Sequence, residues 1–301
     1  MSIKYVLAHR KDPNNVGDIA ADPLQYFLSP DQYQTIDVAH PWQEDYPGDV
    51  PLVVGGGGLI GNDFMGNVVA NYLLSPDEMQ LKQLSEVRWK LISEHNWGTH
   101  RNFKNKYSEL IEESLTNVVK YASSKYAWGI GHNGSTAAVP EYPEELNQYS
   151  AVGLRDWATH SHSWVPCASC LHPALRKNYK IKNPVIWFEH KKQLIKDRSF
   201  GTEPIPRFVN SGANIEQTIE LLGSAETVLT NSYHGAYWAT LLRRRVIVVG
   251  AWSSKFHHMK HAPVQMPAEQ NWKDVLDQTQ IYPHALDECA DANHAFWKRV
   301  K

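Results

Sequence analysis

The sequence predicts an α/β protein with two Rossmann-like domains that face each other across a cleft. Short apolar segments alternate with amphipathic segments along the chain, which is the pattern of β-α-β units. The alternation occurs twice, before and after a polar segment at 138–149 that contains Pro140 and Pro143. The 301 residues are enough for two domains of ordinary size.

The polar segment predicts a domain boundary, giving an N-terminal domain at 1–145 and a C-terminal domain at 146–301. We expect the last helix, 284–299, to pack back on the N-terminal domain. The expected strands are 3–8, 51–54 and 126–130, then 150–154, 185–188, 227–230 and 246–250. The expected helices are 17–28, 59–74 and 107–122, then 215–222, 233–242, 272–276 and 284–299.

The composition excludes several classes of protein. Hydrophobic residues make up 42% and the formal net charge is -2, so the chain has no basic excess for binding nucleic acid. No apolar segment approaches the roughly 20 residues of a membrane span. The first apolar run ends at His9 and Arg10, too short for a secretory signal. Three cysteines, an odd number, indicate a reducing compartment, and we expect a cytoplasmic protein.

Ligands of such folds bind outside the carboxyl ends of the strands, and the first candidate is the segment after strand 3–8. Asn15, Gly17 and Asp18 lie there. Gly17 permits a tight turn or close approach to a ligand, and Asp18 can accept a proton from a hydroxyl. The alternative is a turn with a helix N-cap, a role that Asn and Asp also favour.

A run of four glycines, 55–58, directly follows strand 51–54. Ahead of a helix, the backbone N–H groups of Gly56, Gly57 and Gly58 would suit an anion. Gly56, Gly58 and Gly61 also match G-x-G-x-x-G. The run is not in the first β-α turn, however, and no acidic residue ends a strand about 20 residues on. The pattern therefore favours close backbone approach over a dinucleotide site.

Two later strand ends carry cations. Arg155 follows strand 150–154 and can bind a carboxylate or phosphate through two parallel hydrogen bonds, although a surface pair with Asp156 is an equal alternative. The segment after strand 227–230 places His234 in the first turn of a helix, close to a bound anion and biased toward neutral imidazole. Its companions at this end are Ser232, Tyr233, Gly235 and, after the next strand, Lys255.

Cys167, Cys170 and His172 offer three metal ligands without a second pair at zinc spacing. His190 or His257 could complete such a set. Structural cysteines are the favoured interpretation, so no metal or other cofactor is expected.

Six features follow one another along the chain: Asn-Val-Gly-Asp at 15–18, Gly-Gly-Gly-Gly-Leu-Ile at 55–60, Gly-Ile-Gly at 129–131, Gly-Leu-Arg-Asp at 153–156, Ser-Tyr-His-Gly at 232–235 and Lys255. In this order and spacing they resemble the polysaccharide pyruvyl transferase family. The resemblance spans roughly residues 3 to 256. It implies a fold like the two-domain GT-B glycosyltransferases, with phosphoenolpyruvate as donor and a saccharide as acceptor. Many members have Arg where this chain has Ser232, and others have Ser there, so the donor site of this chain has one possible cation fewer.

The resemblance assigns donor binding to Arg155, His234 and Lys255 in the C-terminal domain, with acceptor binding by the N-terminal domain. We expect His234 to act as acid and Asp18 as base. The glycines 55–58 would line the acceptor side. The alternatives are a glycosyltransferase using a nucleotide sugar and a non-catalytic anion- or sugar-binding protein. The expected partners are phosphoenolpyruvate and a saccharide, lipid-linked or polymeric, with a homodimer as an open possibility.

Overall fold

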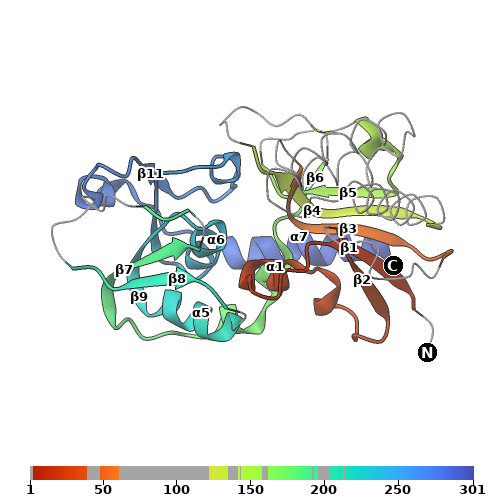
Figure 1. The fold of residues 1–301 in the computed structure, drawn as a ribbon, viewed down its shortest axis with the longest axis horizontal. Helices are drawn as coiled ribbons and strands as arrows, with labels where there is room; N and C mark the ends of the chain where they lie inside the picture. The colour runs from red at the N-terminus through yellow and green to blue at the C-terminus, as the bar shows by residue number, and fades with distance from the viewer. Residues whose placement is uncertain are drawn as a thin grey trace, which may run out of the picture.

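The α/β class is confirmed by two parallel sheets, which lie side by side in Figure 1. The computed structural model describes residues 3–38, 48–60, 122–134, 142, 144–157, 162–191, 193–195, 204–212 and 214–301. The predicted helices at 59–74 and 107–122 fall almost wholly outside these residues. Among the helices of the described ranges, none combines the length and the apolar character needed to cross a membrane.

The first sheet has six strands in the order β2-β1-β3-β4-β5-β6. They are β1 (Tyr5–His9), β2 (Tyr33–Asp37), β3 (Leu52–Ile60), β4 (Lys125–His132), β5 (Ala151–Leu154) and β6 (Ser163–Trp164). The second sheet has five strands in the order β11-β10-β9-β7-β8. They are β7 (Asn183–His190), β8 (Arg207–Asn210), β9 (Ala225–Thr230), β10 (Arg245–Val249) and β11 (Val264–Met266).

Both sheets follow the same doubly wound plan, because in each the first strand lies between the second and the third. Strand order therefore reverses between β1 and β3 in the first sheet and between β7 and β9 in the second. Ligands of such sheets bind at this reversal, outside the carboxyl ends of the strands. The fold thus predicts two binding crevices, one at each sheet.

The predicted domain boundary at 145/146 is wrong. Strand β5 pairs in parallel with β4, and β6 pairs with β5, so residues up to Trp164 complete the first sheet. Arg155, which follows β5, therefore belongs to the N-terminal half and not to the C-terminal one. The polar segment at 138–149 does not mark a domain boundary, because the strands before and after it in the sequence, β4 and β5, are neighbours in one sheet.

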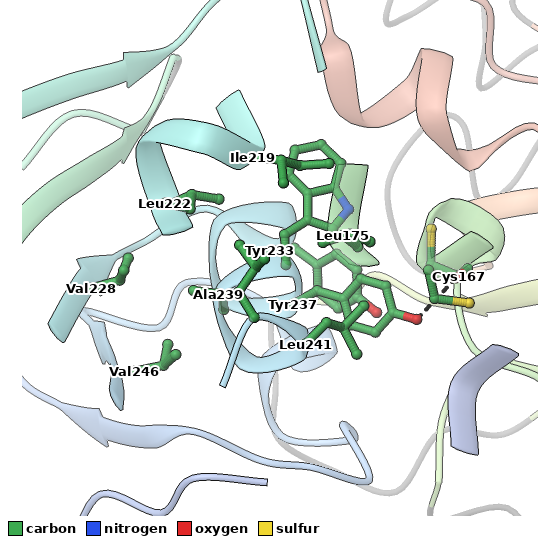
Figure 2. Close-up of a cluster of buried hydrophobic side chains, with 14 of the residues drawn as sticks. Cys167, Leu175, Ile219, Leu222, Val228, Tyr233, Tyr237, Ala239, Leu241 and Val246 are labelled. Atoms are coloured by element: carbon green, nitrogen blue, oxygen red, sulfur yellow. Dashed lines mark hydrogen bonds between the residues drawn. The ribbon is translucent and has the colours of Figure 1, made fainter. Parts of the chain in front are cut away.

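Helices α5 (Ile215–Gly223) and α6 (Tyr233–Leu241) cover one face of the second sheet. Helix α6 is buried along nearly its whole length, and Tyr233 and Tyr237 project from it toward Cys167 (Figure 2). The Tyr237 hydroxyl donates a hydrogen bond to the Cys167 carbonyl at 3.0 Å. The short helix α1 (Val16–Ala21) joins the same apolar cluster through Val16, Ala20 and Ala21. Helix α1 is therefore packed between the two halves of the molecule.

The last helix, α7 (Ala285–Val300), follows the second sheet and runs back across the first (Figure 1). Phe296 and Val300 are buried against Leu7, Val53 and Trp128 of the first sheet. Asn293 is fully buried, and its Oδ1 accepts a hydrogen bond from the Trp128 indole at 2.8 Å. The two halves of the chain are thus joined by a helix as well as by the linker.

Several predicted elements differ from the structure. The predicted helix 17–28 is α1 followed by a 3-10 turn, η1 (Leu24–Tyr26), because Pro23 lacks the N–H that a continuous helix needs. The predicted helix 272–276 is a 3-10 segment, η8 (Trp272–Gln278). Strands β2, β6, β8 and β11 were not predicted. The glycine run is part of β3 and not a loop before a helix, since the strand continues to Ile60.

Candidate functional site

A cavity of about 290 Å³ lies between the two sheets, where the C-terminal ends of their strands face each other. Ten of the twelve residues that the sequence singled out line it, and only Gly17 and Gly235 do not. The cavity contacts residues that follow β1 and residues of the C-terminal part of β3, together with residues at the ends of β7 and β9. Both strand-order reversals therefore open into one shared space.

The lining is rich in charge. Its four cationic side chains outnumber its two carboxylates, and Asp37 and Asp156, which are not in the lining, pair with Arg10 and Arg155. Asp12 pairs with Lys191 at 3.3 Å, across the two halves of the chain. The six charged residues are Arg10, Arg155, Lys191 and Lys255, with Asp12 and Asp18.

Arg155 is buried, with 4% of its surface exposed, and its guanidinium is fixed from several sides. One terminal nitrogen donates to the His132 carbonyl at 2.8 Å, and Nε lies 3.5 Å from Asp156. The guanidinium also stacks over the Tyr233 ring at 4.7 Å. A Cβ at Gly131 would lie 2.4 Å from Nε, so glycine is needed there. A cation held this firmly binds an anion with little loss of conformational freedom.

His234 occupies the first turn of α6, as the sequence predicted, and its ring is enclosed by other rings and a thiol. It lies 5.0 Å from Trp238 and 5.3 Å from Tyr233 between ring centroids. Nε2 is 3.6 Å from the Cys167 sulfur. Burial, assisted by the positive charges of Lys255 and Arg155, lowers the pKa of His234 to about 3. The imidazole is therefore neutral at pH 7.

Ser232 is the N-cap of α6, and its hydroxyl accepts a hydrogen bond from the Gly235 N–H at 3.4 Å. The Asn210 amide nitrogen also donates to that hydroxyl, at 3.1 Å. Gly235 itself faces the sheet and not the cavity, since a Cβ there would lie 2.5 Å from Phe188. The close contact with Phe188 gives Gly235 a role in packing, and ligand binding by its backbone stays a prediction.

Asp18 lies on α1, whose N-cap Asn15 accepts a hydrogen bond from the Gly17 N–H at 3.1 Å. The capping role expected for this segment thus falls to Asn15 and leaves Asp18 at the cavity wall. Burial raises the pKa of the Asp18 carboxyl, against the opposing charges of His9 and Arg10. A carboxylate with a raised pKa is a stronger proton acceptor than an exposed one.

Lys255 lies in the 3-10 turn η7 (Ser254–Phe256), with its ammonium 4.1 Å from the Trp252 ring centre. The neighbouring Ser254 ties this turn to the first half of the chain, because its N–H donates to the Gly134 carbonyl at 2.9 Å and its hydroxyl accepts from the Gly134 N–H at 2.9 Å. Lys255 is therefore placed on the cavity by contacts from both halves.

The glycine run contributes a backbone wall and not a helix N-terminus. Gly56 and Gly57 have φ angles of 75° and 103°, in the region that favours glycine. A Cβ at Gly56 would lie 2.1 Å from the Ala21 carbonyl oxygen at the end of α1. Gly56 thus allows α1 to approach β3, which sets the position of Asp18.

Cys167 and Cys170 are buried in the apolar core and not assembled as a metal site. Cys167 contacts Ser169 at 3.1 Å, Cys170 accepts a hydrogen bond from Asn293 at 3.4 Å, and His172 caps the following turn. Burial raises the pKa of the Cys167 thiol. Across the described ranges, no three His, Cys, Asp or Glu side chains are grouped to hold a metal ion.

Several lining residues were not predicted, and most of them follow strands that were predicted, since only Asn210 belongs to the missed strand β8. His190 and Lys191 follow the predicted strand 185–188, so the same strand-end rule would have found them. Asn210 ends β8 and is itself the one buried residue of that strand, so the strand has no clear apolar signal. The missed residues include Arg10, Asp12, Asn133, His190, Lys191, Asn210 and Trp252.

Comparison with known proteins gives no family. No family model matches the chain, and no curated protein matches it. One solved structure that resembles it is an uncharacterised protein from Klebsiella pneumoniae, with 13% sequence identity and a TM-score of 0.40. The alignment covers 82% of this chain and 83% of that one.

Proposed function

We propose that this protein is a pyruvyl transferase that moves a pyruvyl group from phosphoenolpyruvate to a saccharide as a ketal, on a GT-B-like arrangement of two domains. One observation carries the proposal. Arg155, His234, Lys255 and Asp18, which are distant in the sequence, line one cavity between the two sheets. The family resemblance assigns donor binding to the first three of these residues, and we expect His234 and Asp18 to transfer protons.

The cavity supports an anionic donor of small size. Its volume of about 290 Å³ lies at the lower end of the range of ligand pockets, roughly 300–1,000 Å³. Arg155 is the fixed cation that would orient the donor carboxylate or phosphate. Lys255 and the N-terminus of α6 at Ser232 would stabilise the phosphate as it departs.

The reaction balances with two proton transfers. One sugar hydroxyl oxygen bonds to the central carbon of phosphoenolpyruvate, while the methylene carbon gains a proton and becomes a methyl group. A second hydroxyl oxygen then bonds to this central carbon, and the bond between the central carbon and the ester oxygen of the phosphate breaks. One hydroxyl proton replaces the proton taken up by the methyl group, and the other leaves with inorganic phosphate.

Asp18 and His234 are the groups available for these transfers. Asp18 would accept the hydroxyl proton, because its raised pKa makes it a competent base. His234 is neutral before the donor binds, since its pKa is about 3. A phosphate dianion beside the imidazole would raise that pKa, which lets His234 take up a proton and deliver it to the enol carbon or to the leaving oxygen.

The first test measures the thermal unfolding midpoint with phosphoenolpyruvate, inorganic phosphate, pyruvate or a uridine diphosphate sugar. A ligand that binds the native state raises the midpoint by mass action. We expect phosphoenolpyruvate to raise it in the wild type and in the control Arg176→Lys, which alters an exposed arginine. The shift should be lost in Arg155→Lys, which keeps the charge but not the paired donors.

A shift produced only by the uridine diphosphate sugar would refute the pyruvyl donor and support a nucleotide-sugar glycosyltransferase. If phosphoenolpyruvate binds, phosphate release is then measured with a panel of saccharides that carry neighbouring hydroxyls. Binding without phosphate release for any of them would support the non-catalytic alternative.

A further inference from the structure

His9 lies beneath the cavity at the end of β1, with 3% of its surface exposed. Its ring joins two other elements. Nδ1 is 2.7 Å from the carbonyl oxygen of Gly55 in β3, and Nε2 is 2.7 Å from the carbonyl oxygen of Asp18 in α1. Both are full hydrogen-bond distances.

Both partners of the His9 ring can only accept hydrogen bonds. A neutral imidazole has one N–H donor and one bare nitrogen. A neutral His9 would therefore point the lone pair of one nitrogen at a carbonyl oxygen 2.7 Å away. A doubly protonated ring donates to both oxygens and leaves no buried polar group unsatisfied.

We infer that His9 is an imidazolium, held in that state by the Gly55 and Asp18 carbonyls, and that its charge and geometry position Asp18 as the base of the site. The role in catalysis rests on the proposed function. The charge state of the ring does not.

The position of the Asp18 carbonyl supports a cation. Helix α1 has six residues, so its last four carbonyls lack partners within the helix. Each of the first three receives a side-chain donor: His9 at Asp18, the Gln25 amide at Ile19 at 2.8 Å, and the Tyr26 hydroxyl at Ala20 at 2.8 Å. His9 thus supplies a donor to one of these unpaired carbonyls, whose oxygen carries a partial negative charge that favours a cation.

A second charge faces the ring. The Asp18 carboxyl on α1 and His234 on α6 are two titratable groups that interact with His9. The positive charge of His9 opposes the rise in the Asp18 pKa that burial causes, and it lowers the pKa of His234. A buried cation that has a carboxylate near it and its donors satisfied is tolerated in a protein interior.

The position of the His9 ring also explains why β3 has glycine at position 56. A Cβ at Gly56 would lie 3.0 Å from the His9 ring carbon Cε1, so the ring occupies the space between β3 and α1. The pairing of β1 with β3 ends at Ala8 and Val54. The His9 ring extends that connection by one residue and carries it across to Asp18.

The charge state is tested by nitrogen-15 NMR of the wild-type protein labelled at histidine, without any ligand. The His9 signals are assigned by their loss in His9→Gln or His9→Asn. We expect the His9 ring to show two exchange-protected N–H groups, one for each of its two carbonyl partners. A His9 ring with one bare nitrogen at pH 7 would overturn the inference, and this result does not require that either variant be active.

The link to Asp18 is tested by carbon-13 NMR titration of the aspartate carboxyls, with Asp18→Asn for assignment. We expect the Asp18 pKa to rise in His9→Gln, which removes the charge but keeps a donor, and to be unchanged in His284→Gln, which alters an exposed histidine. An unchanged Asp18 titration in a folded His9→Gln protein would refute the positioning role. A protein that does not bind phosphoenolpyruvate would contradict only the proposed function.

Discussion

The imidazole of His234 lies directly against the backbone of Gly17, so that a Cβ on Gly17 would come within 2.1 Å of Nδ1. The two residues belong to opposite halves of the chain, on α6 and α1. Their contact brings the two groups proposed for proton transfer, His234 and Asp18, to one side of the cavity. Glycine at position 17 is therefore a condition of the site geometry, although Gly17 does not line the cavity.

The substitution Gly17→Ala should displace the His234 ring and impair turnover with little loss of fold. A misplacement of about 1 Å at a catalytic group costs on the order of 10²-fold in rate. Kinetics of phosphate release would measure it, with Ile19→Ala, at an exposed position of the same helix, as the control. Equal activity of Gly17→Ala and the control would contradict a role for this contact.

The pH dependence of stability should carry the signature of His234. Its folded-state pKa of about 3 is below the unfolded value of about 6.5. The unfolded chain therefore binds a proton first, and stability falls as pH drops below about 6.5 toward 3. The free energy of unfolding, measured in urea, should decrease from pH 7 to pH 5 in both proteins. We expect this decrease to be about 1–2 kcal/mol smaller in His234→Gln than in the wild type. His284→Gln should lose as much as the wild type.

Adjacent glycines of β3 offer a matched pair. Both Gly56 and Gly57 have positive φ, but a Cβ at Gly57 meets no atom within 4 Å, whereas one at Gly56 would strike the Ala21 carbonyl. We expect Gly57→Ala to cost only the backbone strain, about 1–3 kcal/mol, and Gly56→Ala to cost clearly more. Chemical denaturation compares them, and equal losses would show that the contact with α1 relaxes freely.

The hydrogen bond between Trp128 and Asn293 should stabilise the attachment of α7 to the first sheet. Replacing Asn293 with Ala leaves the buried indole N–H without its partner, which costs about 1–3 kcal/mol. Urea denaturation would measure the loss, with Lys298→Ala, at an exposed position of the same helix, as the control. A loss no larger than that of the control would mean that the indole finds another acceptor.

Most strand-end residues of the site could be predicted from the sequence because their signals are local. Ser232 before a buried helix predicts a cap, and the cap is present. The glycine run misled because two residues with positive φ and a shift of register let a strand continue through it. Strands β2 and β8 were missed because each has only one or two buried residues. Their pairing partners, not their own side chains, determine that they are strands.

The charge state of His9 and the contact between Gly17 and His234 could not be predicted from the sequence for a different reason. Each depends on where α1 lies relative to distant segments, which is a property of packing. The domain boundary failed for the same reason, since Arg155 joins the first sheet through the pairing of β5 with β4. Local patterns identified the chemistry of the residues but not which half of the molecule holds them.

Among the described elements, helix α7 is synthesised last, although it covers part of the first sheet. The first sheet is made early, yet one of its faces is covered by Phe296 and Val300. A ribosome adds about 5–20 residues per second, so the part of Trp128 that contacts Phe296 stays uncovered for several seconds or more after its own strand is made. The N-terminal half therefore cannot reach its final state alone, and the nascent chain carries an exposed apolar surface until the helix leaves the exit tunnel.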